Sequence, residues 1–137
     1  GFVVPKKSVF NRIVGDSKFE LEFAAFLDAC DDVISFAKNY LAVQFRLDYV
    51  KADGDLSNYI PDFFVKLDGA RLVIVETKGR EELDLPQKMA RLRQWCEDAN
   101  AAQNDQHFDF VYVDQESFDQ YKPKSFEDLL ASFVEYK

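Results

Sequence analysis

The chain has 137 residues, of which 47% are hydrophobic and 14 are phenylalanine, so it can fold as one domain around a single hydrophobic core. Its formal net charge of −8 argues against a free-standing, high-affinity nucleic-acid binder, because neutralising phosphates requires clustered Lys and Arg. The sequence contains no membrane-length apolar run, no signal-peptide pattern and no C-x-x-C pair, which together predict a cytoplasmic protein without a membrane partner.

Hydrophobic periodicity and turn residues divide the chain into an extended N-terminal arm at residues 1–15 and a single domain at residues 16–137. Within the domain the patterns predict a helix, three strands, a helix, a strand and a helix, at residues 17–30, 43–49, 60–66, 70–78, 86–100, 108–113 and from Ser125 onwards, with a loop at 51–58. Since a helix joins the strands at 70–78 and 108–113, these two strands should pair in parallel. The expected fold is α/β, of order α-β-β-β-α-β-α, with a mixed four-stranded sheet flanked by helices.

The most informative residues lie in the two strands at 60–66 and 70–78. Asp62 follows a proline at the head of the first strand, and the triplet Glu76-Thr77-Lys78 ends the second. Side chains of a strand alternate between its two faces, so the glutamate and the lysine share one face and the threonine points to the other. A hairpin of these strands would return the aspartate to the triplet and place two carboxylates and an ammonium group at one sheet end.

The number of residues in the hairpin loop decides whether Asp62 reaches the face of Glu76. A two-residue turn would send the aspartate to the opposite face, whereas an odd loop keeps it on the same face. We therefore predict a three-residue loop, Leu67–Gly69, that pairs Asp62 with Ile74. This loop type predicts a positive φ at Gly69.

Two neighbouring carboxylates predict a divalent-metal site. Mg²⁺ takes oxygen ligands in octahedral geometry and often uses only one or two protein carboxylates, which Asp62 and Glu76 would supply. Such an ion can lower the pKa of a bound water and stabilise charge on a phosphodiester. Lys78 could orient or deprotonate that water. Glu20 could add a carboxylate if its helix packs at the sheet end.

Other interpretations of these residues stay open. Glu-x-Lys is common at strand ends, and Glu20 also completes a capping box with Ser17. Glu22 lies on the other flank of the same apolar face, so periodicity does not choose between the two glutamates. Lys38 and Lys88 could contact DNA phosphates, although a solvated charged face is the alternative. The sequence has no Gly-rich phosphate loop, which predicts that ATP does not bind here.

Pro61-Asp62 and Glu76-Thr77-Lys78-Gly79, in the expected order of elements, resemble the PD-(D/E)xK nuclease superfamily, whose fold is restriction-endonuclease-like. The sequence blocks Asp16–Glu20, Phe36–Asn39, Tyr59–Phe63 and Glu76–Gly79 are similar to one subgroup. That subgroup is the C-terminal endonuclease domain of the restriction subunit of type III restriction enzymes and related helicase-nucleases.

This resemblance implies a Mg²⁺-dependent endonuclease, in which Mn²⁺ can substitute, that cuts double-stranded DNA to leave 5′-phosphate and 3′-hydroxyl ends. By position, Asp62 and Glu76 would bind the metal with the Thr77 carbonyl as a backbone ligand, Lys78 would serve the attacking water, and Glu20 matches the helix glutamate of the group. A helicase-like motor in the same polypeptide would use ATP, and a methyltransferase subunit would read the DNA sequence. A nuclease fold retained only for protein interaction is the alternative, which the acidic charge favours.

Overall fold

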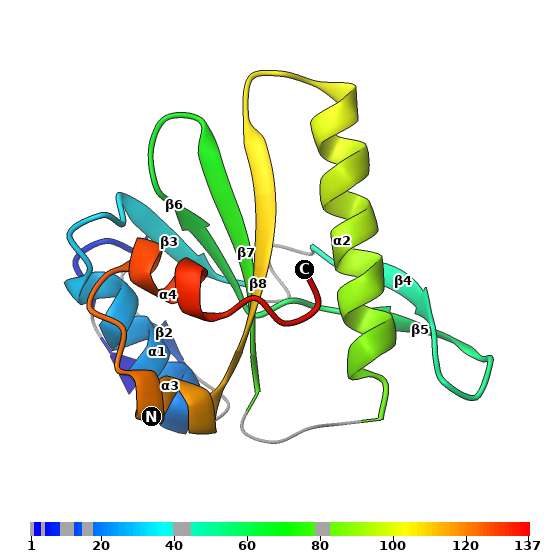
Figure 1. The fold of residues 1–137 in the computed structure, drawn as a ribbon, viewed down its shortest axis with the longest axis horizontal. Coiled ribbons are helices and arrows are strands. Elements are labelled where there is room, and N and C mark those ends of the chain that lie inside the picture. Colours follow the sequence, from blue (N-terminus) through cyan, green and yellow to red (C-terminus); the bar gives the residue numbers. More distant parts are fainter. Residues whose placement is uncertain (1, 4, 9–12, 15–17, 40–44, 79–82) are drawn as a thin grey trace.

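A computed structural model describes residues 2–3, 5–8, 13–14, 18–39, 45–78 and 83–137 (Figure 1). The elements in chain order are β1 (Phe2–Val3), β2 (Ile13–Val14), α1 (Lys18–Ala29), β3 (Ser35–Lys38), β4 (Leu47–Val50), β5 (Leu56–Tyr59), β6 (Phe63–Lys66), β7 (Arg71–Lys78), α2 (Leu85–Ala102), β8 (His107–Asp114), α3 (Gln115–Tyr121) and α4 (Phe126–Ser132). The predicted arm contains β1 and β2, which pair antiparallel. Its separation from the domain stays a prediction.

The central sheet has four strands in the order β3-β6-β7-β8. Strands β3, β6 and β7 pair antiparallel, while β7 and β8 pair in parallel and are joined through α2. This arrangement confirms the expected parallel pair and the α/β class with a mixed four-stranded sheet between helices. The fold is restriction-endonuclease-like.

Two hydrophobic clusters cover the two faces of this sheet. Figure 1 shows α1, α3 and α4 on one side, and α2 with the β4–β5 hairpin on the other. Along β7, Val73 and Val75 belong to the cluster under α1 and α4, and Ile74 belongs to the cluster under α2. By the same alternation the Glu76 side chain lies on the face of Ile74, under α2, and the Thr77 side chain lies on the face of Val75, under α1 and α4. The end of β7 therefore presents polar side chains to both faces, at the point where the apolar run stops.

The identity of the first sheet strand was predicted wrongly. We expected the strand at 43–49 to join the sheet, but β4 pairs instead with β5 in a separate two-stranded ladder. Strand β5 lies partly within the predicted loop at 51–58. The first strand of the central sheet in chain order is β3, at residues 35–38, whose four residues were too short to produce a recognisable alternation. Residues 43 and 44 lie outside the described residues.

The helices agree with the sequence except for α3. Pro86 stands in the first turn of α2, and the Ser125 side chain caps α4 by accepting a hydrogen bond from the Asp128 N–H, both in line with their predicted starts. The residue expected to cap α1, Ser17, lies outside the described residues. Helix α3 was missed because its start depends on one cap, the carboxylate of Asp114 at the end of β8.

Candidate active site

The β6–β7 hairpin has an odd loop of three residues, as predicted, but the loop lies one residue later, at 68–70, where the Leu67 N–H donates to the Arg71 carbonyl. Lys66 pairs with Leu72 and Phe64 pairs with Ile74, so the predicted pairing of Asp62 with Ile74 is wrong by two residues. A shift of two preserves the face of every side chain. The ladder ends with Phe63 opposite Val75, and Asp62 leaves the register in a bend, with its N–H donating to the same Val75 carbonyl. The Asp62 carboxylate lies against the Thr77 side chain, which points to the face opposite Glu76, so the predicted sharing of one face by Asp62 and Glu76 is not observed.

The hairpin loop closes through an aspartate side chain and not through a left-handed glycine. Asp68 Oδ1 accepts hydrogen bonds from the N–H groups of Ala70 and Arg71, both at 2.9 Å. Such an Asx turn supplies the turn hydrogen bonds without a residue at positive φ. The predicted positive φ of Gly69 is therefore wrong, whereas Gly54, in the β4–β5 connection, has a φ of 94°.

Asp62 lies in a bend just before β6, and Thr77 holds its carboxylate. The Thr77 N–H and the Thr77 hydroxyl both donate to Asp62 Oδ2, each at 2.8 Å. The Asp62 N–H donates to the carbonyl of Val75, which ties the same residue to β7 through its backbone. The structure thus brings Asp62 to the Glu-x-Lys triplet, where it is fixed by the residue between the glutamate and the lysine.

Glu76 is a buried carboxyl group with two side-chain partners. It is 1% exposed; its Oε1 accepts from the Tyr59 hydroxyl at 2.9 Å and its Oε2 lies 2.9 Å from Lys78 Nζ. Burial, followed by the negative charge of Asp62, raises the pKa of Glu76 to about 8, against the opposing effects of Lys78 and Tyr59. Glu76 therefore binds a proton much more readily than an ordinary glutamate, unless a further cation approaches it.

Glu20 and Lys38 complete this group of charges. Lys38 Nζ lies 3.6 Å from Glu20 Oε1 and 3.8 Å from Asp62 Oδ1, and both Glu20 and Lys38 are buried. Glu22, which periodicity could not distinguish from Glu20, is exposed. The structure therefore brings Glu20, Asp62, Glu76 and Lys78 to one region, together with Lys38.

The predicted phosphate-binding lysines lie in unexpected surroundings. Lys38 is buried between carboxylates and does not lie on a solvated face. Lys88 is half-buried on α2, with its ammonium group 5.8 Å from the ring centroid of Tyr49 and 5.6 Å from that of Tyr59. A role of either lysine in DNA binding stays a prediction.

Comparison with known families identifies the chain. A family model described as "Endonuclease domain" matches residues 6–123, most of the sequence. The chain belongs to the Endonuclease domain family. No curated protein and no solved structure matched it in the corresponding searches. The protein is thus a nuclease domain, which implies that it binds DNA, and none of its described helices is long and apolar enough to cross a membrane.

Sequence reasoning missed Tyr59 and Asn39 as members of the endonuclease site. The Tyr59 hydroxyl orients Glu76, as described above, and the Asn39 side chain donates to the carbonyl of Pro61 at 2.9 Å. Both residues lie within the sequence blocks that carry the family resemblance, and that position was the available signal. Neither residue type indicates catalysis by itself, because a buried tyrosine or asparagine in a core is usually structural.

The carboxylates of Asp62 and Glu76 are the candidate donors for a divalent ion. Among the described residues, no group of three or more His, Cys, Asp or Glu side chains is arranged to hold a metal. Two carboxylates nevertheless suit Mg²⁺, which keeps several of its water ligands. The burial that disfavours the negative charge of Glu76 also favours any cation that would neutralise it. The residues present therefore fit the ion that the family resemblance implies.

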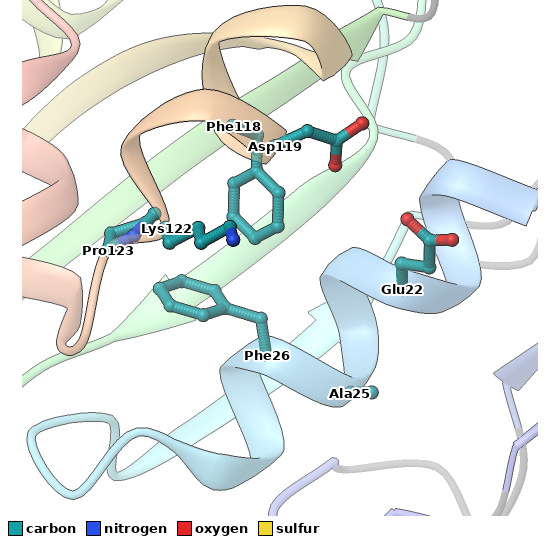
Figure 2. Close-up of a pocket in the computed structure, with 7 residues that line it drawn as sticks. All are labelled: Glu22, Ala25, Phe26, Phe118, Asp119, Lys122 and Pro123. Atoms are coloured by element: carbon teal, nitrogen blue, oxygen red, sulfur yellow. The ribbon is translucent and has the colours of Figure 1, made fainter.

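An open surface cavity of about 560 Å³ lies away from these residues, between α1 and α3 (Figure 2). Phe26 and Phe118 pack edge-to-face in its lining, with ring centroids 5.1 Å apart, and Figure 2 shows Glu22 on α1 and Asp119 on α3 further along it. None of Asp62, Glu76 and Lys78 contributes to its lining. This cavity is therefore separate from the candidate site at the sheet end.

Proposed function

We propose that this domain is a Mg²⁺-dependent endonuclease that hydrolyses DNA phosphodiesters as the cleavage module of a larger, type III-like ATP-dependent restriction enzyme. The observation that carries the proposal is the Glu76 carboxyl group, which is paired with Lys78 two residues along the same strand and whose pKa is raised first by burial and then by the charge of Asp62. A perturbed carboxyl group beside a second carboxylate and an ammonium group is the pattern expected of a catalytic site.

Each residue of the site has a distinct part in the proposed reaction. Asp62 and Glu76 hold the divalent ion, and the backbone carbonyl of Thr77 is a candidate third protein ligand. When bound, the ion supplies electrophilic assistance at the scissile phosphate. Lys78 has a side chain that is 23% exposed, so its ammonium group can reach a substrate from solvent while it contacts Glu76. It would orient the attacking water and offset negative charge in the transition state.

The surrounding enzyme would supply what this domain lacks. A formal net charge of −8 opposes tight binding of DNA phosphates. Delivery by a motor domain in the same polypeptide would raise the local concentration of DNA at the site without requiring a basic surface here. ATP would act through that motor, and a methyltransferase subunit would select the sequence to be cut. Weak, sequence-independent nicking is expected of the isolated domain.

The proposal is tested by plasmid cleavage in the complete enzyme, with and without a divalent ion. The Lys78→Ala enzyme should lose cleavage while its isolated domain still binds Mn²⁺, because Lys78 acts on the water and is not a ligand. Lys66→Ala is the matched control, since Lys66 is an exposed lysine on the neighbouring strand. Full cleavage by the Lys78→Ala enzyme, or undiminished cleavage in EDTA, would exclude the mechanism.

A nuclease fold retained for protein interaction is the second candidate, and the acidic charge is the observation that favours it. This candidate predicts that the domain does not bind Mn²⁺. Calorimetric titration of Mn²⁺ into the wild-type domain and into Asp62→Ala separates the two functions. Binding that is lost in the variant supports the endonuclease, and heats that are equal and negligible in both support the interaction module.

A further inference from the structure

Lys38 is a buried cation between two carboxylates of the active site. Its side chain is 7% exposed, with the ammonium nitrogen 3.6 Å from Glu20 Oε1 and 3.8 Å from Asp62 Oδ1. The ring of Phe63, its pairing partner across β3 and β6, lies 5.5 Å from the same nitrogen. An aromatic face and two carboxylates each attract a cation, so three neighbours from α1, β6 and the preceding bend keep the ammonium group in this position.

The residue after Lys38 fixes the backbone of the catalytic aspartate. The Asn39 N–H donates to the carbonyl of Asp62 at 2.8 Å, and the Asn39 side-chain amide donates to the carbonyl of Pro61 at 2.9 Å. The same amide also donates to the carbonyl of Phe45 at 2.9 Å. The end of β3 therefore holds Asp62 by its main chain through Asn39, and by its carboxylate through Lys38.

The charges of the described site residues determine how many divalent ions they can accept. Glu20, Asp62 and Glu76 contribute three carboxylates, while Lys38 and Lys78 contribute two ammonium groups. One divalent ion on the side of Asp62 and Glu76, together with one bridging phosphodiester, leaves these groups balanced. A second divalent ion between Glu20 and Asp62 would have to displace the Lys38 ammonium group or lie in contact with it. Two positive charges in contact repel strongly, so Lys38 opposes binding of the second ion.

We propose that Lys38 takes the place of a second metal ion: its ammonium group neutralises Glu20, positions Asp62 and restricts the site to one divalent ion. This inference rests on the proposed function, since it assumes that Asp62 and Glu76 hold an ion. Lys38 is a positioning residue in this scheme, because it acts through Asp62 and not on the substrate. Glu20 accordingly acts as the partner of Lys38 and not as a ligand of the resident ion.

Calorimetric titration of Mn²⁺ into the apo domain tests the proposal, with the number of ions bound per chain as the readout. The wild type should bind one ion. Lys38→Met removes the charge from a side chain of similar length, and should bind two. The electron paramagnetic resonance spectrum of Mn²⁺ in this variant should then broaden, because two ions lie close together. Lys38→Arg, which keeps the positive charge, should again bind one.

Glu20→Gln supplies an independent test if Lys38→Met does not fold. Because Glu20 is held by Lys38, this variant should still bind one ion with a Kd within a few-fold of the wild type. Two ions bound by the wild type, one ion bound by folded Lys38→Met, or loss of the ion in Glu20→Gln would each overturn the inference while leaving the proposed endonuclease intact. A wild type that binds no ion would overturn both, so the two failures are distinguishable.

Discussion

The raised pKa of Glu76 should make the stability of the apo domain depend on pH. The pKa rises from an ordinary 4.5 to about 8 in the folded state. Because the folded value lies above the unfolded value, the stabilisation from this group is fully present below pH 4.5 and is lost as the pH rises to 8. At about 1.4 kcal/mol per pH unit, the free energy of unfolding should fall by up to about 5 kcal/mol over this range.

The substitution Glu76→Gln isolates that contribution. The amide retains the shape of the side chain and an oxygen that can accept from the Tyr59 hydroxyl, but it does not titrate. Urea unfolding of both proteins between pH 5 and pH 8 gives the free energy of unfolding at each pH, and subtracting the two profiles cancels all other titrating groups. Between pH 5 and pH 8, the free energy of unfolding of the variant should rise by several kcal/mol relative to that of the wild type. Above pH 8 this difference should stop growing.

A matched control and a metal arm complete this experiment. Glu97→Gln neutralises an exposed carboxylate on α2 that pairs with Arg93 at i, i+4, and should give a difference profile within about 0.5 kcal/mol of zero. At pH 8, Mn²⁺ should raise the melting temperature of the wild type and not that of Glu76→Gln, because only the wild type offers the second carboxylate. A flat difference between pH 5 and pH 8 would refute the reasoning, since it would mean that Glu76 is already ionised at pH 5.

The remaining predictions concern the partners of Glu76. Asp62→Asn should abolish the Mn²⁺-induced rise in melting temperature; an unchanged rise would exclude Asp62 as a ligand. Lys78→Ala should lower the cleavage rate of the complete enzyme by about a hundredfold or more, the usual contribution of a positioned acid–base group, with the Mn²⁺ affinity of the domain little changed. Tyr59→Phe removes the hydrogen bond to a buried oxygen and should cost about 1–3 kcal/mol in urea unfolding at pH 8. An unchanged stability of that variant would show that solvent replaces the hydroxyl.

The elements that could be predicted from the sequence are those with strong local signals. Helix α2 has a proline in its first turn and an apolar stripe, and α4 begins at a serine cap, so both were recognisable from neighbouring residues alone. The odd β6–β7 loop was also predicted, but the reason for that prediction, a face shared by Asp62 and Glu76, did not hold, because Asp62 leaves the ladder in a bend and contacts the Thr77 side chain. The position and type of the turn could not be predicted, because the Asx turn of Asp68 and the left-handed turn expected at Gly69 look alike in an Asp-Gly sequence.

What escaped prediction depends on contacts between distant segments. The alternation at 43–49 is typical of a half-exposed strand, and β4 is one, but alternation does not say which strand it pairs with. The site shows the same limit. Lys38 looked like a surface lysine because its partners, Glu20 and Asp62, lie far from it in the sequence on α1 and in the bend before β6.

The hydrogen bonds and ion pairs of the candidate site hold its carboxyl groups through the side chains of the protein alone. Each carboxylate has partners of its own: Lys38 for Glu20, Thr77 for Asp62, and Tyr59 with Lys78 for Glu76. Such partners reduce the repulsion that would otherwise separate three negative charges, so we expect the domain to fold without the metal. The apo domain can instead store a proton on Glu76 near neutral pH. If Asp62 and Glu76 bind a divalent ion, Glu76 would have to release that proton, and the affinity for Mn²⁺ should therefore rise as the pH rises towards 8. A Mn²⁺ affinity that did not change between pH 6 and pH 8 would show that Glu76 holds no proton that the ion has to replace.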